Sequence, residues 1–305
     1  MAKAKAIKIM IKNIFRALRL PFITASILPF IFGSLIAWKH FNLAGFTLGL
    51  LTVVFTHLSA NLINDYFDSR SGADWSDQNS YGFFGGSKLI QEGILSEKFY
   101  LAAALCCAGL AFICVILLAL NLKTNFVILM YLLIIVLSWQ YTAKPLAFSY
   151  HYLGELFLFI SMGPALVLGG YFIQTGIFPD LKSLVLSLPF GFFISGILFA
   201  NEVPDSSGDK KSGKNNLVSI FGLEKAYLVY YILMSSGILS IFAAWRAGYL
   251  SVISILSFFL IFPMIKAGNI LKNNYSDKLK LIPSSKITIN IQMLAGIILI
   301  LSLWL

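Results

Sequence analysis

The stretch AGFTLGLLTVVFTHLSANLINDYFDSRSGAD, residues 44–74, joins a long apolar run to a group of carboxylates. A membrane-spanning helix needs about 20 mostly apolar residues, and residues 44–66 meet that requirement. At about 100° per residue the polar side chains of this helix fall on one stripe, which consists of His57, Asn61, Asn64, Asp65 and Asp68. A polar stripe on a membrane helix faces a bundle interior or a water-filled cavity. The stretch therefore predicts a transmembrane helix with a polar site at one end.

The whole chain has the composition of an integral membrane protein. Of its 305 residues 58% are hydrophobic and 12% are charged, whereas soluble domains carry about 25% charged residues. Apolar runs long enough to span lie at 22–38, 44–66, 99–121, 124–141, 152–173, 184–203, 225–245, 249–268 and 287–305. The sequence therefore predicts an all-α bundle of about nine transmembrane helices, forming a single domain over residues 1–305.

The basic residues predict the orientation of the bundle. Nineteen of the 23 Lys and Arg lie in the N-terminal segment 1–20 or in the even-numbered loops. Such an excess marks the cytoplasmic side. We therefore expect an inner (cytoplasmic) membrane location, with a cytoplasmic N-terminus and cytoplasmic loops at 67–98 and 204–224. Because the basic residues occupy short loops, the net charge of +10 does not indicate nucleic acid.

A second acidic cluster, NEVPDSSGDKKSGK at residues 201–214, closes the sixth predicted span. Asp205 and Asp209 are spaced i, i+4, so they share a face if the helix continues that far. The pattern Asn-x-x-x-Asp occurs in both clusters, each time at the cytoplasmic end of an even-numbered span. This weak repeat of four helices places the two carboxylate sets at the same depth on the same side.

Two facing carboxylate sets have the chemistry of a magnesium–diphosphate site. Mg²⁺ prefers oxygen ligands and is usually held by one or two carboxylates together with substrate phosphates. Nearby lysines and arginines can neutralise the remaining phosphate charge. The competing interpretation is a set of solvated loop carboxylates, which fits Asp74, Asp77 and Asp209 taken singly but not the two clusters together.

The two clusters resemble the two Asp-rich motifs of the UbiA superfamily of intramembrane prenyltransferases. Three further stretches resemble the branch that prenylates dihydroxynaphthoate in the menaquinone pathway; they are Gly85-Gly86-Ser87 with Gln91-Glu92-Gly93, Tyr141-Thr142-Ala143-Lys144-Pro145-Leu146, and Leu153-Gly154-Glu155-Leu156. Two features depart from the usual pattern. The first motif reads Asp68-x-x-x-Gly72-x-Asp74, where many members have Asp-x-x-x-Asp, and Lys144 stands where an apolar residue or proline is more usual.

The resemblance implies Mg²⁺-dependent transfer of a polyprenyl group from polyprenyl diphosphate to an aromatic acceptor, with 1,4-dihydroxy-2-naphthoate as the expected acceptor. The metal ligands it implies are Asp65, Asp68, Asp205 and Asp209, with Asp74 as a further candidate. Tyr141 is expected to face the allylic cation or to be an interfacial tyrosine. The residues expected to contact diphosphate or acceptor are Asn61, Asn64, Arg70, Lys144, Asn201 and Lys214.

Alternative functions remain open at this point. The same chemistry would serve 4-hydroxybenzoate or another quinone precursor. An ion-coupled transporter would also carry intramembrane carboxylates and an internal repeat, although here the carboxylates cluster near one face and not at the midplane. His57 fits a hydrogen-bonded contact between helices. Glu155 fits a supporting position in the site or a favourable charge at a helix N-terminus.

Overall fold

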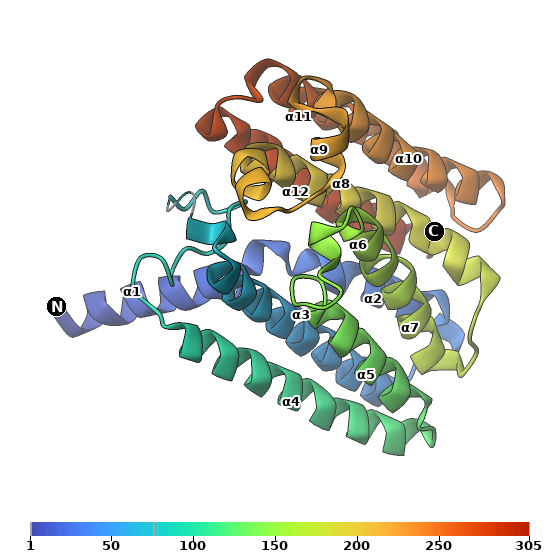
Figure 1. Ribbon diagram of the computed structural model, residues 1–305. Coiled ribbons are helices and arrows are strands. Elements are labelled where there is room, and N and C mark those ends of the chain that lie inside the picture. The colour runs from blue at the N-terminus through green and yellow to red at the C-terminus, as the bar shows by residue number, and fades with distance from the viewer. Residues whose placement is uncertain (1, 76, 78, 305) are drawn as a thin grey trace.

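The computed structural model describes residues 2–75, 77 and 79–304, and every regular element in that part is a helix. The α-helices are α1 Ala2–Ala17, α2 Thr24–Ile36, α3 Leu43–Ser71, α4 Glu97–Leu122, α5 Phe126–Trp139, α6 Gly154–Met162, α7 Pro164–Thr175, α8 Leu181–Ser212, α9 Leu217–Phe221, α10 Ala226–Arg246, α11 Ile261–Asn274 and α12 Lys278–Leu301. Short 3-10 helices lie at Leu20–Phe22, Trp38–His40, Ala73–Trp75 (η3), Phe148–Tyr150, Leu223–Lys225 and Val252–Leu260. The predicted all-α class is confirmed, and Figure 1 shows the helices gathered into one bundle.

Fewer helices than the predicted nine meet the length and hydropathy criteria for a span. Within the described residues, seven helical segments are long and apolar enough to cross a membrane. An eighth is obtained if Ile7–Ala17 and Leu20–Ile36, which are bent by 47°, form one span. The predicted span at 124–141 contains α5, which has only 14 residues. At 1.5 Å per residue, α5 is about 21 Å long, less than the hydrocarbon core of about 30 Å. The chain is thus a multi-pass bundle with seven or eight spans by length and composition.

Helix α8 is the central element of the bundle. In its most apolar window 72% of the residues are buried inside the protein, the largest share of any candidate span in the described chain. It packs against α2, α6, α7, α10 and α12. Gly163, between α6 and α7, lies so close to Gly191 of α8 that a Cβ at Gly163 would be 2.7 Å from the Gly191 backbone nitrogen. Small residues allow this close approach of membrane helices.

Helices α3 and α8, which carry the two acidic clusters, begin in the same way. The Asn42 side chain accepts a hydrogen bond from the backbone N–H of Gly45 at 3.0 Å, and this caps α3. The Asp180 side chain accepts one from Ser183 at 2.7 Å, and this caps α8. Each helix therefore starts at a residue that satisfies one of its unpaired N–H groups.

The two helices also end alike, and later than the sequence predicts. Gly72 (φ 87°) follows α3 and Gly213 (φ 79°) follows α8, both in the left-handed conformation that glycine adopts readily at a helix C-terminus. The loops predicted at 67–98 and 204–224 therefore begin after Ser71 and Ser212. Because the helices continue, Asp68 remains on the polar face of α3 and Asp209 remains on that of α8.

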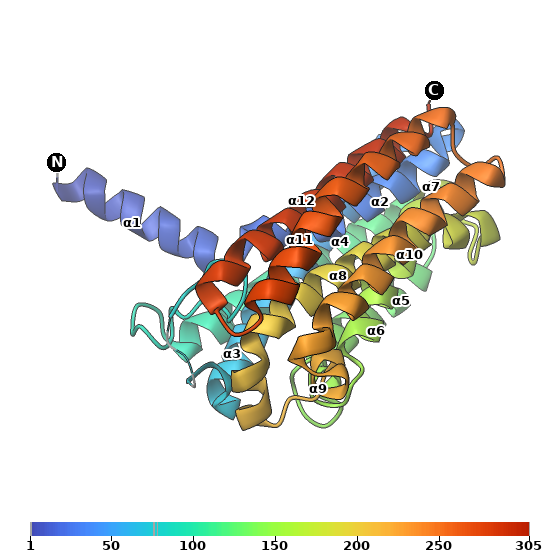
Figure 2. The same cartoon turned by 90° about the horizontal axis from the view of Figure 1, so that it is seen from above.

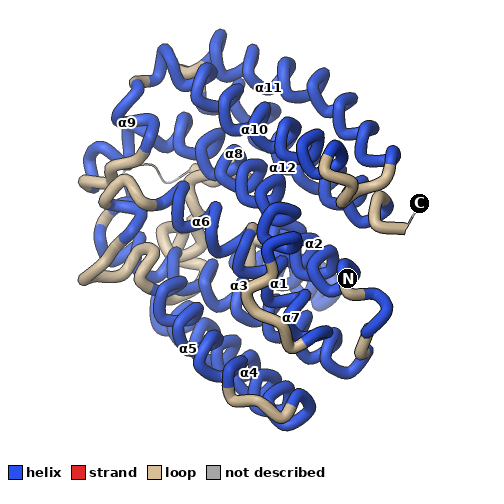
Figure 3. The backbone as a smooth tube through the Cα atoms, turned by 90° about the vertical axis from the view of Figure 1, so that its right-hand side faces the viewer, coloured by secondary structure: helices blue, strands red, loops and turns tan. Residues whose placement is uncertain are grey.

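The long connections gather at one end of the bundle, away from the C-terminus (Figures 2 and 3). This end carries the C-terminal ends of α3 and α8, together with the chain between η3 and α4. Helix α1 projects from the same end and lies apart from the other helices (Figure 2). The fold thus brings two acidic helix ends, separated by more than a hundred residues in sequence, to one end of the molecule.

Candidate functional site

A cavity of about 800 Å³ lies between the C-terminal halves of α3 and α8. Where α6 and α8 run into the bundle, its wall is apolar and is formed by Phe157, Leu158, Met162, Ile194, Ile197 and Leu198. Toward the helix ends its wall is charged and contains Arg19, Asp68, Asp74, Lys88, Asp205, Asp209 and Lys214. The cavity therefore has one apolar part and one strongly charged part.

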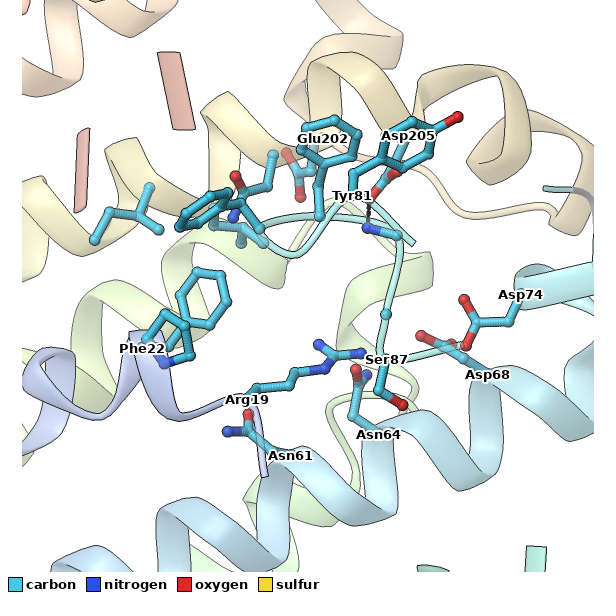
Figure 4. A pocket seen from close by; sticks show the side chains of 18 of the residues that line it. Arg19, Phe22, Asn61, Asn64, Asp68, Asp74, Tyr81, Ser87, Glu202 and Asp205 are labelled. Carbon is cyan, nitrogen blue, oxygen red and sulfur yellow. Dashed lines mark hydrogen bonds between the residues drawn. The ribbon is translucent and has the colours of Figure 1, made fainter. Parts of the chain in front are cut away.

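Figure 4 shows how the two helices face each other across this cavity. Asn61, Asn64 and Asp68 point from α3, and Glu202 and Asp205 point from α8, while the chain around Ser87 passes between them. The backbone N–H of Gly85 donates to Asp205 Oδ2 at 2.8 Å. The backbone N–H of Ser87 donates to Asp65 Oδ2 at 3.3 Å. This short glycine-rich segment therefore bridges the two acidic clusters.

The two carboxylates of α3 are each paired with a cation from a distant segment. Asp65 is 1% exposed and accepts a hydrogen bond from Arg19, which precedes α2. Lys214 Nζ, just after α8, is 2.8 Å from Asp68 Oδ2. Burial alone would lower the pKa of Lys214, but Asp68 and Asp209 more than offset this and raise that pKa well above its ordinary value. Lys214 is therefore a fixed positive charge between the two clusters.

Asp74 lies beside these groups and is paired with Lys88. Lys88 Nζ is 2.8 Å from Asp74 Oδ1 and donates to the Asp74 carbonyl oxygen at 2.9 Å. Burial, together with the charges of Asp68 and Asp65, raises the pKa of Asp74 to about 6, although Lys88 opposes this shift. The sequence did not decide whether Asp74 belongs to the site. The structure places Asp74 in the charged part of the cavity.

The carboxylates of α8 have fewer cationic partners. Asp205 accepts only the Gly85 N–H among the hydrogen bonds within the described chain. Asp209 Oδ2 accepts a hydrogen bond from Asn216 Nδ2 at 3.0 Å. Because α8 is helical through this region, Asp205 and Asp209 lie one turn apart on the face that lines the cavity.

The crowded position of Gly86 leads to a prediction. A Cβ at Gly86 would lie 3.0 Å from both Asp74 carboxylate oxygens and 3.3 Å from Arg19 Nη2, at a φ of 77°. Gly86→Ala should therefore displace these charges and lower activity at least about tenfold, with a stability loss of about 1–3 kcal/mol from backbone strain. Gly82→Ala is the matched control, because Gly82 has a φ of 82° and nothing within 4 Å of its Cβ position. Measuring the activity and the melting temperature of both variants separates the effect of backbone strain from that of the displaced charges. Equal activity of Gly86→Ala and Gly82→Ala would contradict the prediction.

The donor set suits Mg²⁺ held jointly with phosphate oxygens. Asp68 Oδ1 and Asn201 Oδ1 are buried with no hydrogen-bond partner in the described chain, and both residues line the cavity. Among the residues that the structure describes, no three carboxylate, histidine or cysteine side chains converge closely enough to hold a metal by themselves. Mg²⁺ is usually bound by one or two carboxylates plus substrate phosphates, so this arrangement fits. Asp68 from α3 and Asp205 and Asp209 from α8 are the residues that would hold it.

Most predicted site residues meet at this cavity. Besides Asp68, Asp74, Asp205 and Asp209, the cavity wall includes Asn61, Asn64, Tyr141, Asn201 and Lys214, whereas Asp65 is not part of it. The Asn61 amide donates to the Leu18 carbonyl oxygen at 3.2 Å, and that of Asn64 donates to Thr142 Oγ1 at 2.5 Å. His57 also lines the cavity, and both of its ring nitrogens are buried without a hydrogen-bond partner in the described chain. The predicted hydrogen-bonded contact for His57 is therefore wrong.

Two predicted substrate contacts lie elsewhere. Arg70 is exposed, donates to the Tyr66 hydroxyl at 2.7 Å and lies over the Tyr66 ring. It follows Asp68 by two residues, about 200° around the helix, so it points away from the cavity. Lys144 is exposed in the connection after α5 and is not part of the cavity wall. The structure brings neither side chain to the site.

Two cations and one carboxyl group at the cavity were not predicted from the sequence. Arg19 and Lys88 both have backbone in the left-handed region, with φ of 49° and 60°, and both line the cavity. No local sequence pattern predicts a left-handed turn at a non-glycine residue. The carboxyl group is that of Glu202, which lies within the second cluster, one turn before Asp205. Helical periodicity would have predicted its position on the same face as Asp205.

Comparison with known sequences identifies relatives of the chain. The model of the UbiA prenyltransferase family matches residues 26–282. The 1,4-dihydroxy-2-naphthoate octaprenyltransferase of Bacillus subtilis is 29% identical over 202 residues, which are 66% of this chain and 63% of that protein. The human UbiA prenyltransferase domain-containing protein 1 is 28% identical over 221 residues, 69% of this chain and 61% of that protein. The matched part thus spans less than two thirds of these relatives.

Solved structures share the fold at low sequence identity. A UbiA homolog from Aeropyrum pernix superposes with a TM-score of 0.66 at 18% identity, covering 92% of this chain and 96% of that one. A UbiA homolog from Archaeoglobus fulgidus, bound to DMAPP and Mg²⁺, has a TM-score of 0.63 at 17% identity, covering 94% and 98%. The likeness shows that the chain shares its helical fold with these two proteins.

Proposed function

The chain belongs to the UbiA prenyltransferase family, and from this premise we propose that it transfers a polyprenyl group from polyprenyl diphosphate to an aromatic acceptor, with Mg²⁺ as cofactor. The observation that carries the proposal is the divided cavity. Its charged part has carboxylates from two helices interleaved with Arg19, Lys88 and Lys214, and its apolar part continues directly into the bundle. A molecule with an anionic head and a hydrocarbon tail matches both parts.

The charged part can stabilise a leaving diphosphate. Bound Mg²⁺ would act as a Lewis acid that neutralises negative charge on the phosphate oxygens. Arg19, Lys88 and Lys214 each pair with a carboxylate here, and each can turn a donor toward a phosphate oxygen. Such fixed charges favour breakage of the allylic carbon–oxygen bond, because they are in place where negative charge develops.

The apolar part can protect the allylic cation. Phe157, Ile194 and Leu198 exclude water that would otherwise react with it. Tyr141 lines the same region, and its ring lies 5.7 Å from the ring of Phe157. Burial and the nearby charges of Glu202 and Glu155 raise the pKa of Tyr141, so its hydroxyl is neutral. A neutral aromatic ring at this point suits a transient cation.

The expected acceptor is 1,4-dihydroxy-2-naphthoate, which appears in the name of the Bacillus subtilis relative. 4-Hydroxybenzoate is the alternative acceptor with the same chemistry. An ion-coupled carrier is the alternative from another class, but the charged groups lie at the helix ends and the known relatives are named as prenyltransferases. We further propose a cytoplasmic membrane location with the charged part facing the cytoplasm, based on the excess of Lys and Arg at that end.

The proposal predicts metal-dependent transfer in a direct assay. Purified protein in detergent, given radiolabelled polyprenyl diphosphate, Mg²⁺ and dihydroxynaphthoate, should form a labelled apolar product. EDTA should abolish the reaction and added Mg²⁺ should restore it, because the carboxylates alone repel the diphosphate. Hydroxybenzoate in a parallel reaction identifies the acceptor. Label transfer that is unchanged by EDTA would contradict the role of the metal.

A further inference from the structure

Glu202 and Glu155 form a buried pair of carboxyl groups that the proposed mechanism does not use. Glu202 is 9% exposed, Glu155 is 4% exposed, and their side chains lie within hydrogen-bonding range of each other. Two carboxyl groups in this position share one proton, because both cannot be ionised side by side. Oxygen Oε2 of each residue is buried and has no donor among the described residues. A buried acceptor without a donor is costly, so each such group calls for an explanation.

The two residues differ in how firmly they are held. Glu155, in the first turn of α6, accepts the backbone N–H of Leu217 on Oε1 at 2.7 Å. Its backbone carbonyl also accepts the Ser195 hydroxyl of α8 at 3.0 Å. Glu202 lines the cavity, whereas Glu155 does not. Glu155 is therefore anchored behind Glu202, and Glu202 is the carboxyl group that a substrate can reach.

Glu202 lies at the boundary between the two parts of the cavity. On α8 it follows Leu198 of the apolar wall by four residues and precedes Asp205 by three, so all three share one face. An allylic diphosphate lying along the cavity places its reacting carbon at this boundary. Figure 4 shows Glu202 on the α8 side, next to Asp205 and across from α3. The charged neighbours of Glu202 are Glu155, Asp209 and Lys214.

We propose that Glu202, oriented by Glu155, binds a ring hydroxyl of the aromatic acceptor and takes its proton as the new carbon–carbon bond forms, while the proton shared by the pair moves onto Glu155. This inference rests on the proposed prenyl transfer. A phenolic hydroxyl is the donor that the buried oxygens lack, and the aromatic ring next to it fits the apolar wall beside Tyr141 and Phe157. Glu202 would thus recognise acceptors that carry a hydroxyl group on the aromatic ring, next to the ring carbon that is prenylated.

The step balances in atoms and electrons. The allylic carbon–oxygen bond breaks, and its electron pair leaves with the diphosphate. The O–H bond of the acceptor breaks and its proton goes to Glu202, as the proton shared by the pair moves onto Glu155. The electron pair released into the ring forms the carbon–carbon bond at the adjacent ring carbon. If that carbon carries a carboxylate, CO₂ leaves and the oxygen regains the proton from Glu202. If it carries hydrogen, that hydrogen leaves as a proton to water at the mouth of the cavity, and the oxygen likewise regains the proton from Glu202.

The test compares Glu202→Gln with Glu155→Gln and with the exposed control Glu224→Gln, all loaded with Mg²⁺. Glu202→Gln should raise the KM for dihydroxynaphthoate at least about tenfold and lower kcat about 100-fold or more, while the KM for prenyl diphosphate stays unchanged. Glu155→Gln should show a smaller loss of about tenfold, since it acts through Glu202. Glu224→Gln should match the wild type. Melting temperatures of all variants show whether they are folded.

Methyl ethers of the acceptor hydroxyls distinguish a direct contact from a structural role. Dihydroxynaphthoate has two ring hydroxyls and therefore two monomethyl ethers. With the ether of the hydroxyl that Glu202 binds, wild type and Glu202→Gln should be equally slow, because the methyl group has already removed the hydrogen bond to Glu202. A Glu202→Gln variant with wild-type KM and kcat for the naphthoate, or with an equal loss of prenyl diphosphate binding, would overturn the inference.

Equilibrium binding separates this inference from the proposed function. The naphthoate's own fluorescence reports its binding without any reaction. If the wild type transfers no prenyl group but binds the naphthoate, and Glu202→Gln weakens that binding at least about tenfold, the transfer is refuted and the hydroxyl contact of Glu202 is supported. Equal binding by the two proteins, or no binding by the wild type, refutes the contact.

Discussion

The Asp205→Asn variant should lose activity about 100- to 1,000-fold, while its fold and its melting temperature stay close to those of the wild type. Asp205 has a single hydrogen bond in the described chain, from the Gly85 N–H at 2.8 Å, and an asparagine oxygen can accept the same bond. The substitution therefore removes a negative charge that would hold Mg²⁺ and leaves the local structure in place. Loss of one electrostatic contact to a transition state typically lowers kcat by this factor.

The matched control for Asp205→Asn is Asp180→Asn at the other end of α8. Asp180 caps the helix through the Ser183 N–H, and asparagine is an equally good N-cap. The chemical change is thus identical, on the same helix, 25 residues from Asp205 along the chain. Product formation at saturating Mg²⁺ measures both variants. If both retain full activity, the α8 carboxylates do not hold the metal.

The Lys214→Met variant should be destabilised by about 3 kcal/mol or more, because it leaves a buried carboxylate without its cation. The Lys214 and Asp68 side chains are 14% and 8% exposed, and Nζ and Oδ2 are 2.8 Å apart. Asp209 is a second negative neighbour of Lys214, so removal of this one cation affects both clusters. Asp68→Asn alone should cost less, since Lys214 keeps Asp209.

A double-mutant cycle tests this account of Lys214. The double variant Lys214→Met with Asp68→Asn should recover a large part of the stability lost by Lys214→Met alone, because the uncompensated charge is gone. Thermal unfolding in detergent, monitored by helical circular dichroism, measures all four proteins. Additive losses in the double variant would show that the pair is not coupled and would contradict the ion pair as the reason for the burial of Lys214.

The parts of the site that lie on helices could be predicted from the sequence. Asn61, Asp65 and Asp68 share a face because a membrane helix has a fixed period of 3.6 residues, and Asp205 and Asp209 share one for the same reason. The ends of both helices are also encoded locally, by Gly72 and Gly213. The pairing of the two clusters followed from their equivalent positions at helix ends.

The partners of these carboxylates could not be predicted in the same way. Arg19 and Lys88 reach Asp65 and Asp74 through left-handed turns in irregular segments, and such contacts depend on the tertiary fold. Arg70 was predicted to contact the substrate because it is close to Asp68 in sequence. Helical periodicity, however, places Arg70 on the opposite side of α3 from Asp68. Hydropathy alone also does not show that α5, within the predicted span 124–141, has only 14 residues.

The arrangement explains how one cavity can serve two incompatible requirements. The diphosphate needs charge and metal, whereas the allylic cation needs dry, apolar surroundings. Helix α8 supplies both on one face, with Ile194 and Leu198 followed by Glu202, Asp205 and Asp209. Its burial at the centre of the bundle keeps that face in place.

The most direct test of prenyl transfer at this cavity is the release of diphosphate from a prenyl diphosphate by the purified protein. We expect release that requires Mg²⁺ and an aromatic acceptor, that equals the amount of prenylated product, and that is lost in Asp205→Asn. A carrier would release none. Absence of diphosphate release from folded protein with Mg²⁺, polyprenyl diphosphate and dihydroxynaphthoate or hydroxybenzoate would contradict the account.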